Sequence, residues 1–286
     1  MSDGPGTLQP LLYRPLLASA LREDLGAAGD LTTDAVVDDD AAASGQIVAR
    51  APGRVAGVDV AVATFALLDG DVTVERCVVD GTEVDAGTVL ARLHGSARAI
   101  LTGERVALNV LGRLCGIATA TGRFVDRIGD RATRVVPTRK TTPGLRALER
   151  HAVRCGGGVD HRFGLADGVL IKDNHIAVAG GITPAVTRAR TRVGHMVRIE
   201  VEVDTLDQLD EAIALPIDAV LLDNFSPGDL ATAVARTPGH IVTEASGGVT
   251  LDTVGAVADA GVDLVSVGWL THSAPALDVA LDFAPD

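Results

Sequence analysis

Residues 198–224 read RIEVEVDTLDQLDEAIALPIDAVLLDN, and this stretch decides the fold. Two short apolar runs, at 198–203 and 219–222, flank a segment that begins at Thr205, a residue type that often caps helices. Short runs of Val, Leu and Ile are typical of parallel strands that are covered on both faces. The stretch therefore predicts a strand–helix–strand unit.

The same alternation continues through the chain after residue 132. Further buried strands are predicted at residues 134–137, 168–171, 241–243 and 264–267. Helix starts are predicted at Thr142-Pro143, Thr183-Pro184, Ser226-Pro227 and Thr250. The helix from Pro143 is expected to end at the glycines 156–158. We count six or seven β/α units, which is short of the eight in a complete barrel.

The first half of the chain has a different pattern. Residues 46–93 alternate between apolar and polar positions and contain several Gly turns, which predicts a small antiparallel sheet with strands at 72–79 and 88–93. Residues 10–25 have leucines at helical spacing. Residues 96–128 are predicted to form a helix that bridges two domains. Its apolar stripe consists of Leu101, Val106, Leu108, Leu111 and Leu114.

Composition restricts the class of protein. The 286 residues are 47% hydrophobic with only seven Phe, Tyr and Trp, so the core is built from aliphatic side chains. A net charge of −13 argues against a nucleic-acid partner, which needs a broad basic face. The three cysteines are sparse and fit reduced thiols. We see neither a signal peptide nor an apolar run long enough for a membrane span, and expect a cytoplasmic protein.

One segment reverses the acidic character of the chain. Residues 139–172 hold seven of the 25 Lys and Arg, including both lysines, Lys140 and Lys172, against three acids. A compact ammonium that persists in an arginine-rich chain indicates a role that a guanidinium does not fill. The segment is either a site for a multiply charged anion or a solvated basic helix face, and composition alone leaves both open.

Ionisable residues and glycines follow the predicted strands. Apolar strands that end repeatedly in such residues indicate a site on the C-terminal face of an α/β barrel. The residues concerned are Arg139, Lys140, Lys172, Glu202, Asp204, Asp223, Glu244, Gly247, Gly248 and Gly268.

Long runs at these positions resemble one enzyme family. They include TRKTTPGLRALE at 138–149, GGGVDHR at 156–162 and LIKDNHI at 170–176. Together with EVEVD at 200–204 and EASGG at 244–248, they resemble quinolinate phosphoribosyltransferase, also called nicotinate-nucleotide pyrophosphorylase (carboxylating). The resemblance extends over nearly the whole chain.

The resemblance implies an α/β fold, with an N-terminal open-faced α/β sandwich followed by an incomplete α/β barrel of about seven strands. The expected domains are residues 1–116 and 117–273, with residues 274–286 packing back on the first. It also implies a homodimer in which the N-terminal domain of one subunit closes the active site of the other.

The family reaction transfers the phosphoribosyl group of phosphoribosyl pyrophosphate to quinolinate with decarboxylation. The products are nicotinate mononucleotide, pyrophosphate and CO2, and the step belongs to de novo NAD biosynthesis. By resemblance, the expected catalytic residues are Lys140, Lys172, Glu202 and Asp223. Glu202 and Asp223 are also expected to bind Mg²⁺, which prefers oxygen ligands.

The expected substrate contacts follow from the charges of the two substrates. Arginines suit the two carboxylates of quinolinate, and Arg105 is expected to come from the partner subunit. The 5-phosphate is expected on a glycine loop near a helix N-terminus. The full expected set is Arg105, Thr138, Arg139, Lys140, His161, Arg162, Lys172, Ser246, Gly247, Gly248, Gly268 and His272.

Other residues of the basic segment have structural interpretations. The helical spacing of Arg146, Arg150 and Arg154 favours a solvated face or ion pairs with a partner. His151 and His175 are expected to be local hydrogen bonders. Cys155 is expected to pack in the interior.

Three residues depart from the family pattern: Pro137, Asp160 and Trp269. Asp160 and Trp269 keep open a paralogous phosphoribosyltransferase that acts on a different heterocyclic acceptor, although the arginine set for two carboxylates argues against it. Residues 79–90 also resemble the hairpin of a biotinyl or lipoyl carrier, but residues 1–139 contain no lysine for the attachment. A binding protein without catalysis is disfavoured because the expected catalytic residues are intact.

Overall fold

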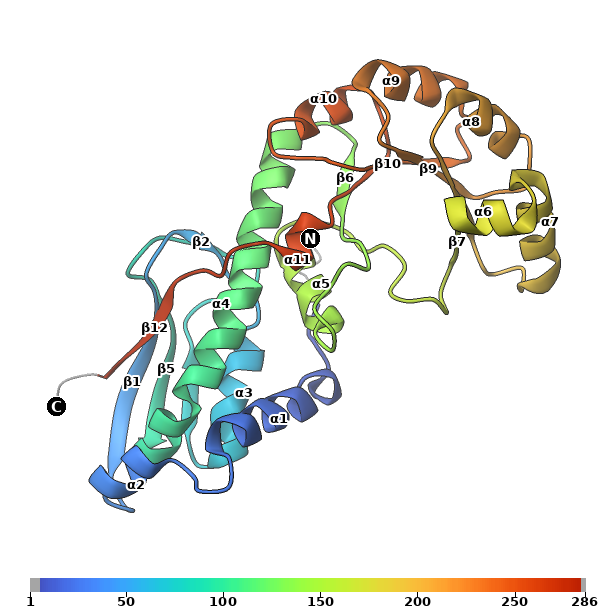
Figure 1. Cartoon of the computed structure of the whole chain (residues 1–286). Helices are drawn as coiled ribbons and strands as arrows, with labels where there is room; N and C mark the ends of the chain where they lie inside the picture. The colour runs from blue at the N-terminus through green and yellow to red at the C-terminus, as the bar shows by residue number, and fades with distance from the viewer. Residues whose placement is uncertain (1–5, 284–286) are drawn as a thin grey trace. The chain divides into compact units, whose positions relative to one another are not determined.

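The computed structural model describes residues 6–283, which divide into two compact units (Figure 1). Of the described residues, the first unit holds 6–122, 141–157 and 270–283, and the second holds 123–140 and 158–269. Residues 1–5 and 284–286, at the ends of the expected N-terminal domain and C-terminal segment, lie outside the described residues. The domain limits expected from the sequence stay a prediction.

An antiparallel sheet with the strand order β12-β1-β5-β3 forms one layer of the first unit. Its strands are β1 (Ala42–Ala49), β3 (Thr73–Arg76), β5 (Val89–Ser96) and β12 (Val279–Phe283). Two short strands, β2 (Gly53–Arg54) and β4 (Glu83–Val84), form a separate pair. The predicted strands at 72–79 and 88–93 are confirmed as β3 and β5. The end of the chain joins this sheet because β12 pairs with β1, with Ile47 opposite Leu281.

The helices of the first unit include the 3-10 helix η1 (Pro10–Leu12), α1 (Arg14–Leu25), α2 (Leu31–Val36), α3 (Val58–Leu68) and α5 (Arg146–Cys155). An aliphatic core lies between the sheet, α3 and the long helix that follows β5. The long helix α4 (Ala97–Ile128) contributes residues to both units. Its predicted stripe is buried except for the half-buried Leu101. Of the helices in residues 6–283, none combines the length and hydrophobicity that crossing a bilayer requires.

Helix α5 starts later than the sequence predicts. Gly144 has a left-handed φ of 83°, so residues 143–145 form a turn and the helix begins at Arg146. The predicted end is confirmed, because the helix stops at Cys155 before Gly156. The expectation of a solvated face is wrong for Arg150, which is only 4% exposed. This helix is fixed inside the unit, where its fully buried Glu149 pairs with Arg113 of α4.

Six parallel strands with the order β6-β11-β10-β9-β8-β7 form the sheet of the second unit. They are β6 (Arg134–Val136), β7 (Val169–Ile171), β8 (Ile199–Val203), β9 (Ala219–Asp223), β10 (Val242–Ser246) and β11 (Leu264–Ser266). All six strands predicted from the sequence are confirmed. The sheet is fully parallel, as the continuous apolar runs indicate.

Helices follow these strands along the outer side of the sheet (Figure 1). They are α6 (Asp173–Ala179), α7 (Ile182–Arg192), α8 (Leu206–Ile213), α9 (Pro227–Arg236) and α10 (Val254–Asp259). The short α11 (Trp269–His272) follows β11, and its residues 270–272 belong to the first unit. The predicted caps at Thr205 and Ser226 are confirmed, because their side chains accept from backbone N–H groups of Gln208 and Asp229. The helix predicted from Thr250 begins at Val254 instead.

The barrel is incomplete because β6 and β7 are the two edges of the sheet. Among the described residues, the parallel sheet has six strands, whereas the resemblance implied about seven. The segment after the three glycines takes the position beside β6, where the Val159 N–H donates to the Val135 carbonyl at 2.8 Å. Glycine disfavours regular strand structure, so this segment pairs through that bond without forming a full ladder.

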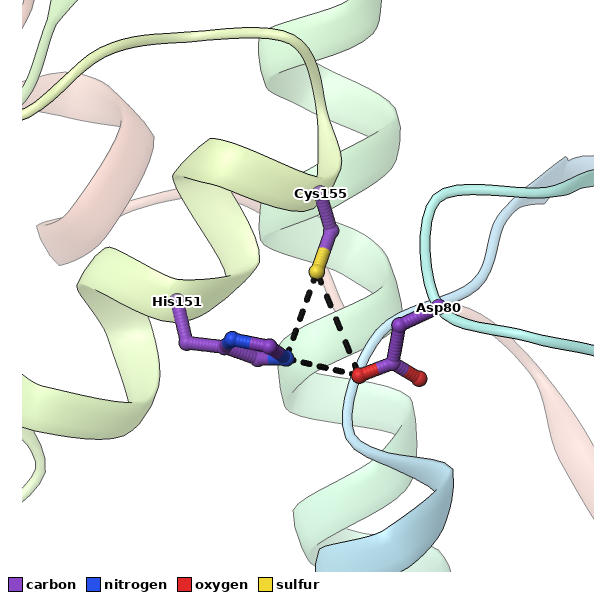
Figure 2. Close-up of side chains that lie close together, drawn as sticks. All are labelled: Asp80, His151 and Cys155. Atoms are coloured by element: carbon purple, nitrogen blue, oxygen red, sulfur yellow. Dashed lines mark hydrogen bonds and ion pairs between the residues drawn. The ribbon is translucent and has the colours of Figure 1, made fainter. Parts of the chain in front are cut away.

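A buried polar cluster connects three elements of the first unit (Figure 2). His151 and Cys155 lie one turn apart on α5, and Asp80 lies in the turn before β4. Asp80 Oδ2 is 2.6 Å from His151 Nε2, which is also 3.4 Å from Cys155 Sγ. The Asp80 carboxylate also accepts from the backbone N–H groups of Gly57 and Val58 at the start of α3. Asp80 thus joins α3 to α5.

The geometry of this cluster indicates a structural tether. A Cys–His–acid relay uses both ring nitrogens of the histidine, but here Asp80 and Cys155 approach the same one. Burial raises the pKa of the Cys155 thiol, which disfavours the thiolate. The buried Nδ1 of His151 has no hydrogen-bond partner in residues 6–283, whereas metal-binding histidines normally donate from that position. These observations agree with the structural roles expected for His151 and Cys155.

We predict that Asp80→Asn destabilises the protein in a pH-dependent way. Burial raises the pKa of Asp80, but hydrogen bonds from His151, Gly57 and Val58 outweigh it and hold the pKa below its ordinary value. A depressed folded-state pKa stabilises the protein above the unfolded pKa, and this stabilisation is lost as the pH falls through the folded pKa. The variant should therefore lose about 1–3 kcal/mol of unfolding free energy at pH 7.

Urea unfolding at pH 7 and at about pH 3 measures this effect, because below the ordinary pKa of about 3.9 the carboxyl becomes neutral in the unfolded state and its stabilisation of the folded state declines. The difference between the two proteins should shrink at the lower pH. Asp85→Asn is the matched control, since Asp85 is exposed in the next turn. An equal loss at both pH values would contradict the assigned role of the Asp80 charge.

Candidate active site

The register of the parallel sheet gathers acidic side chains on one face. Glu202, Leu221 and Glu244 lie opposite one another on β8, β9 and β10. Side chains alternate between the two faces of a strand, so Glu200 and Asp223, each two residues from a member of this row, share its face. The helices cover the other face. The acidic residues therefore point to the inside of the incomplete barrel.

Lys172 and Glu202 are brought together at the C-terminal ends of β7 and β8. Lys172 Nζ lies 2.6 Å from Glu202 Oε2. The Lys172 side chain is 45% exposed, whereas that of Glu202 is 12% exposed. Lys172 also precedes α6, and its backbone N–H donates to Nδ1 of His175, which confirms the structural role expected for that histidine. Two of the four expected catalytic residues are thus direct neighbours.

The ends of β9 and β10 meet in a tight arrangement around Asn224. Asn224 has a left-handed φ of 56°, the one non-glycine residue with positive φ among residues 6–283. Its side-chain amide donates to Asp223 Oδ2, and its backbone N–H donates to the Ser246 carbonyl. Gly247 has a φ of 91°, and a Cβ there would lie 2.2 Å from Asn224 Oδ1. Only glycine fits between these two strand ends.

Basic residues converge on the same end of the barrel. Burial and the nearby positive charge of Arg139 lower the pKa of the Arg162 guanidinium. Arg162 is anchored because Nη1 donates to the Gly168 carbonyl at 3.1 Å. Thr138 Oγ1 accepts from the backbone N–H of Lys140, which fixes the turn after β6. Thr138, Arg139, Lys140 and Arg162 therefore belong to one unit with Lys172.

His161 lies against two buried glutamates. Its Nε2 is 3.0 Å from Glu244 Oε2 and 3.4 Å from Glu200 Oε2. Its Nδ1 accepts from the backbone N–H of Arg162 at 2.8 Å. Burial lowers the pKa of His161, but the two carboxylates outweigh it and raise the pKa to about 10. A second proton would occupy Nδ1 and break the bond from the Arg162 amide, so the geometry favours a ring protonated on Nε2 alone.

The remaining expected residues are divided between the units. Ser246, Gly247, Gly248 and Gly268 lie in the second unit, at the ends of β10 and β11. Arg105 and His272 lie in the first unit. Arg105 is exposed and pairs with its neighbour Glu104, while His272 Nδ1 is 2.6 Å from Ser273 Oγ.

The expected helix N-terminus at the glycine loop is only partly present. Helix α10 begins at Val254, several residues beyond Gly248, while the four-residue α11 begins immediately after Gly268. Trp269, the first residue of α11, is 40% exposed. At the end of β10, hydrogen-bond donors for an anion would therefore come mainly from the backbone N–H groups of residues 246–248 and not from a helix N-terminus.

Glu202 and Asp223 form a suitable pair for a divalent metal ion. The register places their Cα atoms on one face, one strand and two residues apart, which corresponds to roughly 8 Å. Two carboxylates at this separation can share one ion through their side chains. Hard oxygen donors of this kind suit Mg²⁺, which fills its other positions with water and substrate phosphates.

Glu200, Glu244 and Asn224 are site residues that were not selected from the sequence. Alternation along residues 200–204 puts Glu200 and Glu202 on one face, and it was this ambiguity that led to Glu202 alone. Glu244 stood at a strand end but carried no assigned role. The contacts of His161 with Glu200 and Glu244 identify both glutamates as site residues. His161 comes from a distant irregular segment, so the periodicity of the sequence does not predict these contacts.

Comparison with known proteins places the whole chain in one group. The model of the Quinolinate phosphoribosyl transferase N-terminal domain matches residues 30–115, and that of its C-terminal domain matches residues 117–282. The chain is 46% identical over 272 residues to a probable nicotinate-nucleotide pyrophosphorylase [carboxylating] of Bacillus subtilis, covering 95% of this chain and 93% of that protein. It is 42% identical to the Mycobacterium leprae enzyme of that name, covering 94% and 96%.

Solved structures show the same architecture. The crystal structure of NadC from Streptococcus pyogenes superposes with a TM-score of 0.93 at 38% identity, covering 98% of this chain and all of that chain. The nicotinate-nucleotide pyrophosphorylase from Francisella tularensis gives a TM-score of 0.93 at 37% identity, covering 99% and 100%. An incomplete α/β barrel with an antiparallel N-terminal sheet is therefore the established fold of these relatives.

We predict that Gly247→Ala disrupts the loop between β10 and α10. The left-handed φ and the clash with Asn224 together should lower the unfolding free energy by about 1–3 kcal/mol. Gly239→Ala is the control, because Gly239 is exposed in the same unit and has open space around it. Chemical denaturation of both variants measures the difference. Equal stabilities would show that the strand ends can relax around a methyl group.

Proposed function

The chain belongs to the quinolinate phosphoribosyltransferase family, and we propose on that basis that it transfers the phosphoribosyl group of phosphoribosyl pyrophosphate to quinolinate. The ring nitrogen forms a bond to the ribose carbon as the bond to pyrophosphate breaks. One carboxylate then leaves as CO2, and the carbon that it leaves takes up a proton. The product is nicotinate mononucleotide, an intermediate of de novo NAD biosynthesis.

The clustering of Arg139, Arg162 and Lys172 in one unit with Glu202 is the observation that carries this proposal. Quinolinate brings two carboxylates, and a guanidinium binds a carboxylate through two parallel hydrogen bonds. The mutual influence of Arg139 and Arg162, seen in the lowered pKa of Arg162, supports their approach to the same anion. Each charge-assisted bond contributes about 1.5–3 kcal/mol.

The main contribution of the protein to the reaction would be to bind and position the two substrates. Arg139, Arg162 and Lys172 would hold the quinolinate carboxylates, and Arg105 of the partner subunit would cover them. Lys140 would lie against the anionic ribose donor. Once the ring nitrogen has become positively charged, it stabilises the electron pair that decarboxylation leaves on the adjacent carbon. Positioning and electrostatics therefore carry most of the catalysis.

Mg²⁺ is the cofactor that we propose, with Glu202 and Asp223 as the residues that would hold it. When bound, the ion neutralises charge that develops on pyrophosphate. The contact of Lys172 with Glu202 uses Oε2, so the second carboxylate oxygen remains for the ion. Asp223 is oriented by the side-chain amide of Asn224.

The 5-phosphate of the ribose donor is proposed to bind at Ser246, Gly247, Gly248 and Gly268. Consecutive glycines with left-handed φ turn backbone N–H groups toward an anion. His272 would add a donor to this phosphate. Trp269 follows Gly268 and would form part of the wall of this subsite.

A homodimer with shared sites and a cytoplasmic location complete the proposal. The exposed position of Arg105, with its side chain 64% accessible, supports a contribution to a second subunit. A paralogous transferase that acts on another heterocyclic acceptor is the alternative, and Pro137, Asp160 and Trp269 are the residues that favour it.

We predict that the protein, incubated with quinolinate, phosphoribosyl pyrophosphate and Mg²⁺, releases CO2 and forms nicotinate mononucleotide. Radiolabelled CO2 and chromatography of the nucleotide measure the two products. Chelation of Mg²⁺ should abolish turnover and its restoration should recover it. Absence of turnover with quinolinate, together with activity on another heterocyclic acid, would favour the paralogous transferase.

We predict that Arg105→Ala and Lys172→Ala are each inactive and that mixed dimers recover activity. A mixed dimer has one site with both residues intact, so random exchange of subunits should restore about a quarter of the wild-type activity. Arg188→Ala, at an exposed arginine of α7, is the control and should remain active. Mixed dimers that form but stay inactive would count against the shared site.

A further inference from the structure

The cluster of His161, Glu200 and Glu244 has a geometry that direct binding of substrate does not explain. Both ring nitrogens of His161 are already engaged by protein groups, Nδ1 by the Arg162 amide and Nε2 by the two carboxylates. The two glutamates are only 8% and 1% exposed. None of the three presents its polar atoms freely to a ligand.

Burial of these carboxylates is costly, which indicates a purpose beyond stability. Glu244 Oε2 lies 3.0 Å from His161 Nε2, the nitrogen that carries the ring proton, so this buried carboxylate faces a neutral donor rather than a full positive charge. Burial of a carboxylate costs free energy unless an opposite charge or hydrogen bonds compensate for the lost water. An apolar interior would hold the barrel together at least as well.

The cluster instead connects three parts of the barrel to one backbone position. Glu200 is on β8, Glu244 is on β10, and His161 follows the irregular segment at Val159 that lies beside β6. That segment has no assigned strand structure. The imidazole fixes its backbone at Arg162, since Nδ1 accepts from the N–H of that residue.

We propose that Glu200 and Glu244 are positioning residues that act through His161 to fix the backbone of Arg162 and so aim its guanidinium at a carboxylate of the substrate. The inference rests on the proposed function. His161 thus contributes to the quinolinate pocket indirectly, through its neighbour. The bond from Arg162 Nη1 to the Gly168 carbonyl fixes the other end of the side chain. Backbone and guanidinium are then both held before the substrate arrives.

This role makes a substrate-selective prediction for Glu244. Glu244→Ala should raise the KM for quinolinate by roughly tenfold or more and leave the KM for phosphoribosyl pyrophosphate nearly unchanged. Glu244→Gln should lie much closer to wild type, because the amide oxygen still accepts from His161 Nε2. Steady-state kinetics with each substrate varied in turn separates the two constants. Glu200→Ala, measured in the same way, covers the case in which Glu244→Ala fails to fold.

The matched control is Thr243→Val. Thr243 is a buried polar residue on the same strand whose hydroxyl donates to Asp263 Oδ2 at 2.9 Å. Its side chain points to the opposite face, so the control should lower stability without a selective change in KM. Wild-type turnover of quinolinate is measured in parallel. Its absence would overturn the function and this inference together, whereas an active wild type with equal KM changes for both substrates in the Glu244 variants would overturn the positioning role alone.

Discussion

Strand register in the second unit is the constraint on which the active site depends. A shift by one residue in any strand would turn its inward side chains toward the helices. In the ladder from β7 to β10, Leu170 lies opposite Glu200. Leu221 lies between two glutamates, opposite Glu202 on one side and Glu244 on the other. The aliphatic residues between them, such as Val201 and Leu222, are fully buried on the other face, where the helices pack. Packing of the outer layer therefore sets the positions of the charges inside.

The charges inside this sheet are arranged in layers. The deeper layer pairs His161 with Glu200 and Glu244, and all its members are largely buried. The outer layer, at the strand ends, pairs the more exposed Lys172 with Glu202. Coulomb interactions are stronger in the buried layer because water screens them less. The buried layer is therefore suited to hold positions, and the outer layer is suited to exchange its partners for substrate.

The sequence predicts the regular elements well because burial leaves a local pattern. All six barrel strands and the caps at Thr205 and Ser226 follow from apolar runs and capping residues. The position of the segment at Val159 is not predictable in this way, because its backbone bond to β6 follows three glycines instead of an apolar run. Arg150 was predicted on a solvated face or in ion pairs with a partner for a similar reason, since helical spacing does not reveal which faces of α5 are covered. Contacts between charged residues that are distant in the sequence do not produce a periodic pattern, so they cannot be predicted from it.

The two lysines illustrate how a single side chain is constrained by this geometry. The chain uses arginine for nearly all its other cations, yet Lys140 and Lys172 follow β6 and β7. A guanidinium at position 172 would bind both oxygens of Glu202 in a bidentate pair. The ammonium contacts Oε2, which leaves the second oxygen for a metal ion or for substrate. Under the proposed mechanism Glu202 must serve two cations in turn, and a point charge allows this where a planar fork would not.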